Sequence, residues 1–145
     1  ECYDLAEKLQ LQDVFFLGTV NVLEYMEQFD FTILTSISEG QPLAVLESFA
    51  AGRPCVTTDV GCCKQLIGGM ERDTLGPAGY CVPPMHREAI CAAMEQLCTR
   101  PEERYRMGMT GKKRVELYFR HEDMIRNYLQ AYDEVFRKWQ ESDSV

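Results

Sequence analysis

Two glutamates eight positions apart, Glu39 and Glu47, flank a turn whose composition suits a phosphorylated ligand. Between them, Gly40 permits a close backbone approach, and Pro42 suits the first position of a helix because its φ is preset and its missing donor would be unpaired anyway. No Ser, Thr, Asp or Asn stands at position 41 to cap the following amides. Free amides and the positive end of the helix dipole favour an anion such as phosphate. The carboxylates repel phosphate and would accept hydrogen bonds from hydroxyls, so the turn fits a sugar nucleotide.

The turn needs a strand before it and a helix after it. Residues 31–35 form a short β-branched and apolar run that predicts a buried strand. Residues 43–51 predict a helix that Gly52 and Pro54 end. In an open α/β sheet such a strand-to-helix turn lies at the carboxyl edge, where ligands bind.

The rest of the chain continues this alternation and then becomes helical. The predicted strands are residues 14–17, 31–35, 54–58 and 78–82. The predicted helices are residues 1–10, a helix capped by Asn21, 43–51, a short helix after Asp59, 87–99, 101–119 and 122–140. A glycine-rich loop spans residues 68–79. In the last helix an apolar stripe, which should pack on the sheet or against something missing, comprises Leu129, Tyr132, Val135, Phe136 and Trp139.

Strands alternating with helices predict the α/β class, with a Rossmann-like parallel sheet, flanking helices and a helical C-terminal tail. We expect a single partial domain, with an α/β nucleotide-sugar-binding core in residues 1–84 and the C-terminal helices of the same domain in 85–145. Four strands are few for a doubly wound sheet, so the chain is expected to start partway through its domain.

Composition narrows the class of protein. The 145 residues are 46% hydrophobic, and no apolar run approaches the length of a membrane span. A net charge of −8 argues against nucleic-acid binding. The seven cysteines lack a Cys-x-x-Cys pair, which disfavours a zinc site and fits reduced, mostly buried thiols in a cytoplasmic protein.

The order of elements and the Glu-x7-Glu spacing resemble the C-terminal half of family 4 glycosyltransferases, which have the GT-B fold. The likeness covers nearly the whole chain, through Phe16-Leu-Gly18, residues 34–47, Ala51-Gly-Arg-Pro54 and Thr58-Asp-Val-Gly61. Residues 34–39 and 75–79 most resemble the PelF-type branch, whose members use UDP-glucose and serve extracellular polysaccharide synthesis.

That resemblance implies roles for particular residues. Glu39, with Gly40 and Gln41, would bind the donor sugar, and Glu47 would bind the ribose hydroxyls. The amides around Gly40, Gln41, Leu43 and Ala44 would hold the diphosphate, and the loop Gly18-Thr19-Val20 would lie against the nucleobase. The implied reaction is retaining transfer of a hexose to a polysaccharide or glycan acceptor. No metal or other cofactor is expected, since the chain has no Asp-x-Asp motif.

Two parts of the family's site lie outside this sequence. The Arg and Lys that neutralise the diphosphate belong to an upstream segment, as does the N-terminal acceptor-binding domain, which would be a partner within the same protein. Gln65 stands at a position that is often acidic in the family. The chain alone is therefore expected to be inactive. Association of the whole enzyme with a membrane polysaccharide-synthesis complex is a further expectation.

Simpler interpretations stay open beside these. Glu39 would then be an exposed loop acid, and Glu47 would form a structural ion pair with Arg53 or Lys64. Cys62 and Cys63 would be packing residues rather than redox groups. The alternative for the whole chain is a non-catalytic nucleotide-binding or regulatory α/β module. The acceptor, the exact donor and the oligomeric state are not specified by the sequence.

Overall fold

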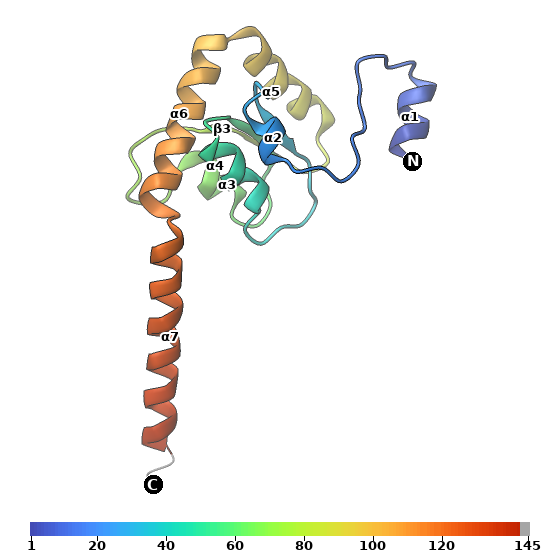
Figure 1. The fold of residues 1–145 in the computed structure, drawn as a ribbon. Coiled ribbons are helices and arrows are strands. Elements are labelled where there is room, and N and C mark those ends of the chain that lie inside the picture. Colours follow the sequence, from blue (N-terminus) through green and yellow to red (C-terminus); the bar gives the residue numbers. More distant parts are fainter. Residues whose placement is uncertain (143–145) are drawn as a thin grey trace.

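The computed structural model describes residues 1–142, with side chains through Gln140, and shows a small α/β body from which a long helix projects (Figure 1). The strands are β1 (Thr32–Leu34), β2 (Cys55–Thr58) and β3 (Gly79–Val82). The helices are α1 (Cys2–Lys8), α2 (Leu23–Met26), α3 (Leu43–Ala50), α4 (Cys63–Gly68), α5 (Arg87–Thr99), α6 (Pro101–Tyr118) and α7 (His121–Ser142). Within the described residues, no helix is both long and apolar enough to cross a membrane.

The sheet is parallel, with the order β1-β2-β3, so the predicted α/β class is confirmed. Ile33 lies opposite Val56, which in turn lies opposite Tyr80. All four residues of β2 are buried because this strand lies in the middle of the sheet. Such a strand is a run of consecutive apolar and β-branched residues rather than an alternating pattern.

The core has one cluster on each face of the sheet. Successive side chains of a strand point to opposite faces. Accordingly Cys55 packs with Val45 and Phe49 of α3, whereas Val56 packs with Leu97 of α5. The two faces are therefore covered by different helices, and α3 is fixed by its buried apolar side.

Helix α6 packs closely on the α3 side of the body. A Cβ at Gly108 would lie only 2.1 Å from the carbonyl oxygen of Gly52, so any larger residue there would force α6 away from the turn after α3. Gly108 is itself buried. This close packing brings the end of α6 beside α3 and sets where α7 begins.

Helix α7 extends away from the sheet (Figure 1). Its predicted apolar stripe is confirmed as one helix face but is exposed, with Tyr132 70% and Phe136 55% accessible. Of the two expectations for this stripe, packing on the sheet is therefore wrong. Phe136 and Trp139 contact each other, with ring centroids 5.9 Å apart.

The predicted strand at residues 14–17 is wrong, because the structure has an exposed irregular segment there. An apolar run becomes a strand only where a neighbouring strand accepts its backbone hydrogen bonds, and within the described residues β1 pairs only with β2. The predicted cap of α2 by Asn21 is wrong, since the N-cap position is Val22, with no side-chain cap, and Asn21 instead donates its side-chain amide to Glu24.

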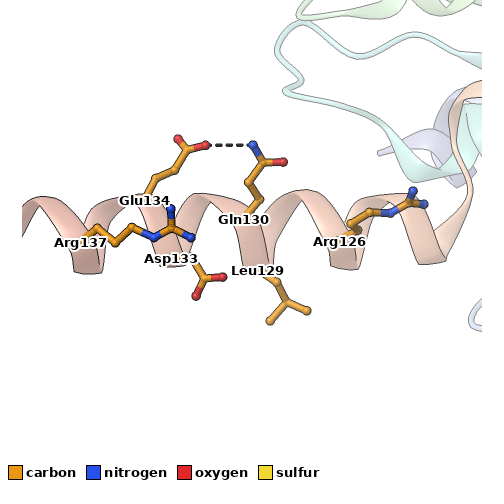
Figure 2. A pocket seen from close by; sticks show the side chains of 6 residues that line it. All are labelled: Arg126, Leu129, Gln130, Asp133, Glu134 and Arg137. Atoms are coloured by element: carbon orange, nitrogen blue, oxygen red, sulfur yellow. Dashed lines mark hydrogen bonds between the residues drawn. The ribbon is translucent and has the colours of Figure 1, made fainter.

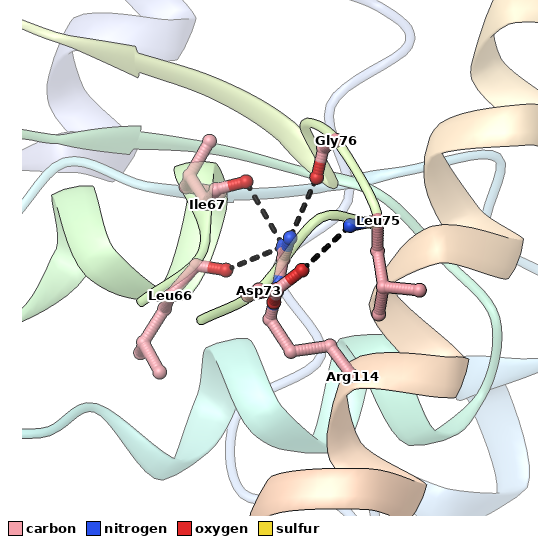
Figure 3. A network of polar contacts seen from close by, with 6 residues as sticks. All are labelled: Leu66, Ile67, Asp73, Leu75, Gly76 and Arg114. Atoms are coloured by element: carbon pink, nitrogen blue, oxygen red, sulfur yellow. Dashed lines mark hydrogen bonds and ion pairs between the residues drawn. The ribbon is translucent and has the colours of Figure 1, made fainter. Parts of the chain in front are cut away.

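The glycine-rich loop before β3 is attached to α6 by a buried ion pair (Figure 3). The Nε atom of Arg114 donates to Asp73 Oδ2 at 2.5 Å, and both side chains are 1% exposed. The other guanidinium nitrogens donate to the carbonyls of Leu66, Ile67 and Gly76 at 2.6–3.0 Å. The Arg114 hydrogen bond holds the pKa of Asp73 below its usual value. We call this group the Arg114 cluster.

Candidate functional site: the turn between β1 and α3

The turn between β1 and α3 carries Glu39 and Gly40 at the carboxyl end of β1, as predicted. Glu39 is half-buried and Gly40 is exposed. The Ser36 hydroxyl donates to Glu39 Oε1 at 2.7 Å. Within the described residues this is the only hydrogen bond to the Glu39 carboxylate, which therefore has acceptor capacity left.

Helix α3 begins without a side-chain cap. Pro42 is the N-cap residue, with an extended ψ of 114°, and no side chain of the described residues hydrogen-bonds to the amides of the first turn. The prediction that Pro42 would be the first helical residue is thus wrong by one position. Leu43 and Ala44 are exposed, and their amides belong to the unpaired donors of a helix start. The positive end of this eight-residue helix therefore faces solvent beside Glu39.

Glu47 is an exposed carboxylate on α3, one turn after Leu43. The alternative of a structural ion pair with Arg53 or Lys64 is not supported, because each of these cations lies against another group. Arg53 donates to the carbonyl of Glu27 at 2.5 Å, and Lys64 lies 4.0 Å from Asp59. Among the described ion pairs none includes Glu47. An exposed carboxylate with no intramolecular partner is available to a ligand.

Three predicted site residues lie together in one groove of about 910 Å³, between α3 and the junction of α6 with α7. They are Gln41, Leu43 and Glu47. The opposite wall includes Tyr118, Phe119, His121, Met124 and Tyr128. These residues were not predicted from the sequence to line the site. The apolar pattern of the last helix was a signal, because it indicated that one face of this helix packs against another surface.

The other predicted nucleotide-binding residues, Gly18, Thr19 and Val20, are exposed in the connection between α1 and α2. Within the described residues no hydrogen bond joins them to residues 39–47. Their role against a nucleobase stays a prediction.

A second hollow, of about 340 Å³, lies along α7 alone (Figure 2). Its residues include Arg126, Gln130 and Glu134, and Gln130 donates to Glu134 at 2.9 Å. All of its lining comes from one helix, so it cannot surround a ligand. We therefore place the candidate site at α3.

The cysteines give no sign of a second chemical site. All seven are free, and two of them, Cys55 and Cys63, are buried, so the expectation of mostly buried thiols is wrong. Burial raises the pKa of Cys55 and of Cys81 to about 11, and it also raises the pKa of Cys62. These thiols stay protonated at neutral pH and are weak nucleophiles. Among the described residues, no group of three His, Cys, Asp or Glu side chains could hold a metal ion.

The parallel sheet and its flanking helices define an α/β fold, with the turn between β1 and α3 as a candidate ligand-binding site at the carboxyl end of β1. The chain belongs to the family "Glycosyl transferases group 1", whose profile matches residues 1–114.

Known proteins agree with that assignment. Over 135 residues the chain is 30% identical to the N-acetyl-alpha-D-glucosaminyl L-malate synthase of Bacillus anthracis, covering 92% of this chain and 34% of that protein. Over 74 residues it is 38% identical to the O-antigen biosynthesis glycosyltransferase WbnH of Escherichia coli, covering 49% of this chain and 22% of that protein. The chain thus spans about a third or less of these relatives.

Among solved structures, the sucrose-phosphate synthase of Thermosynechococcus elongatus has the same fold. Its TM-score is 0.82 at 23% identity, and the match covers 94% of this chain and 34% of that one. This similarity confirms the GT-B class of fold predicted from the sequence.

Proposed function

We propose that the chain is the nucleotide-sugar-binding part of a retaining glycosyltransferase, which transfers a hexose from UDP-glucose to a polysaccharide or glycan acceptor. The observation that carries this proposal is the placement of an uncapped helix start between two carboxylates that both have acceptor capacity left. Phosphate oxygens would accept from the amides of Leu43 and Ala44. Sugar hydroxyls would donate to Glu39 and ribose hydroxyls to Glu47.

The chemistry of this arrangement is electrostatic. When the bond between the sugar and the diphosphate breaks, negative charge grows on the leaving phosphate. Amides fixed at a helix start stabilise that charge without reorganising during the reaction. No metal is required in this proposal, and the chain would contribute binding and leaving-group stabilisation rather than a general base.

The proposal includes a partner domain within the same protein. The groove beside Glu47 continues into the exposed apolar stripe of α7, and such a surface on an isolated body marks an interaction site. An N-terminal acceptor-binding domain would cover this surface, and a segment upstream of this sequence would bring the Arg and Lys that neutralise the diphosphate. The whole enzyme would act in the cytoplasm, in association with a polysaccharide-synthesis complex at the membrane.

Isothermal titration calorimetry with UDP and UDP-glucose tests the proposal. We expect both ligands to bind with a stoichiometry of one, and ADP and GDP to bind more weakly than UDP. Absence of heat with every nucleotide would contradict the proposal and favour the alternative of a regulatory module. Tighter binding of ADP or GDP would keep the transferase class and overturn the choice of uridine.

A further inference from the structure

We infer that Ser36 is a positioning residue that fixes the carboxylate of Glu39 and thereby determines how the donor sugar is held. The end of β2 in turn fixes Ser36. This inference rests on the proposed function, because it assigns the part of the site that distinguishes a nucleotide sugar from the bare nucleotide.

Ser36 and Glu39 are joined directly by a hydrogen bond. The Ser36 Oγ atom donates to Glu39 Oε1 at 2.7 Å. This distance is typical of a charge-assisted hydrogen bond from a hydroxyl to a carboxylate. This hydrogen bond restrains the Glu39 side chain through Oε1 and leaves Oε2 without a partner among the described residues, so that Oε2 can accept from a sugar hydroxyl.

Ser36 is itself held by a buried group. The hydroxyl of Thr58, the last residue of the central strand β2, donates to the carbonyl oxygen of Ser36 at 2.5 Å. Thr58 is 1% exposed, and a β-branched side chain has few rotamers. The backbone of Ser36 is therefore fixed relative to the core.

The residues after β2 hold the turn on the other side of Glu39. The amide of Cys62 donates to the carbonyl of Gly40 at 3.0 Å. Gly61 has a φ of +54°, and a Cβ there would lie 2.3 Å from the carbonyl oxygen of Glu39. Only glycine allows these two turns to touch in this way. Glu39 is thus held at both its side chain and its backbone.

A carboxylate that is fixed before the ligand arrives discriminates better than a mobile one, because its position does not adapt to a different sugar. Loss of the Ser36 hydroxyl would free the Glu39 side chain without altering the start of α3. The affinity of the protein for UDP-glucose should then fall, whereas its affinity for UDP should stay the same. A residue that merely supported the fold would weaken both ligands together.

The test is the ratio of the Kd of UDP to the Kd of UDP-glucose, measured by calorimetry on the purified protein. We expect Ser36→Ala to lower this ratio about tenfold, as for a lost hydrogen bond to a charged group, and to change the Kd of UDP less than twofold. Ser36→Thr keeps the hydroxyl and should restore the ratio. Ser38→Ala, at an exposed serine of the same turn, is the matched control and should leave the ratio unchanged.

A ratio unchanged by Ser36→Ala overturns the inference, as does an equal loss of affinity for both ligands. A wild-type ratio near one also overturns it, because the sugar would then contribute nothing, but it leaves UDP binding intact. Failure of the wild-type protein to bind UDP would overturn the proposed function as well. The two failures are therefore distinguishable.

Discussion

Two regions of this protein each contain acidic side chains and differ in how completely the hydrogen bonds of those side chains are satisfied. In the Arg114 cluster, the guanidinium donates to one carboxylate and three carbonyls, and the carboxylate of Asp73 also accepts from the Leu75 amide at 2.8 Å. At the turn between β1 and α3, Glu39 accepts one hydrogen bond from the described residues and Glu47 forms no described ion pair.

This difference separates a structural group from the candidate binding site. A buried charge is tolerated only when it is paired and fully hydrogen-bonded, as Arg114 is. Glu39 is half-buried and Glu47 is exposed, and both carboxylates have acceptor capacity left, so neither is a buried charge that requires a partner within the fold. Changes in the cluster should therefore affect stability, whereas changes in the turn should affect ligand binding.

The largest expected effect is that of Arg114→Met. Removing the guanidinium leaves Asp73 buried without its partner and three carbonyls without a donor. We expect the free energy of unfolding, measured by urea denaturation, to fall by about 3–5 kcal/mol.

Arg126→Met is the matched control, because Arg126 is exposed on α7 and Asp123 is the one hydrogen-bond and ion-pair partner it has among the described residues. The control should change the free energy of unfolding by less than about 0.5 kcal/mol. If Arg114→Met lowered the free energy of unfolding no more than Arg126→Met does, the structural role of the Arg114 cluster would be contradicted. Should the protein not fold at all, Arg114→Lys gives a smaller perturbation of the same cluster.

The second effect is expected at the turn. Glu47→Ala should raise the Kd of UDP about tenfold, which corresponds to about 1.4 kcal/mol, because the ribose hydroxyls lose their acceptor. Its unfolding free energy should change by less than about 0.5 kcal/mol, since the side chain is exposed. Calorimetry and urea denaturation on the same preparation measure both quantities. Glu95→Ala, at an exposed position of α5, is the control, and equal UDP affinity in both variants would refute the assignment of Glu47.

A smaller effect concerns pH. The pKa of Asp73 is lowered from 3.8, chiefly by the hydrogen bond from Arg114. A lowered pKa in the folded state means that this carboxylate stabilises the protein above pH 3.8 and that the contribution is lost as the pH falls through the lower, folded-state value. The difference in unfolding free energy between wild type and Asp73→Asn should therefore shrink from pH 6 to pH 3. If the difference in unfolding free energy stayed constant from pH 6 to pH 3, the charge of Asp73 would not contribute to stability.

The turn between β1 and α3 could be predicted from the sequence more accurately than the segment at residues 14–17. Glu39 and Glu47 could be placed because an apolar run, a glycine and a helical pattern follow one another locally. The strand at residues 14–17 was predicted wrongly because strand formation depends on a neighbouring strand, which periodicity does not reveal. The three long helices α5, α6 and α7 were predicted within two residues at each end, since their patterns are long.

The Arg114 cluster could not be predicted, because Asp73 and Arg114 are 41 positions apart and neither lies in a motif. The same holds for Thr58 and Ser36, which meet only because β1 and β2 are neighbours in the sheet. Contacts of this kind depend on topology, whereas the turn itself depends on local composition.

The most direct test of the contrast is an NMR titration of backbone amides with UDP-glucose. We expect the amide signals of Gly40, Gln41, Leu43 and Ala44 to shift with a common Kd, and those of Asp73 and Arg114 to stay unchanged. Shifts centred on the loop of the Arg114 cluster, with the turn unaffected, would contradict the account.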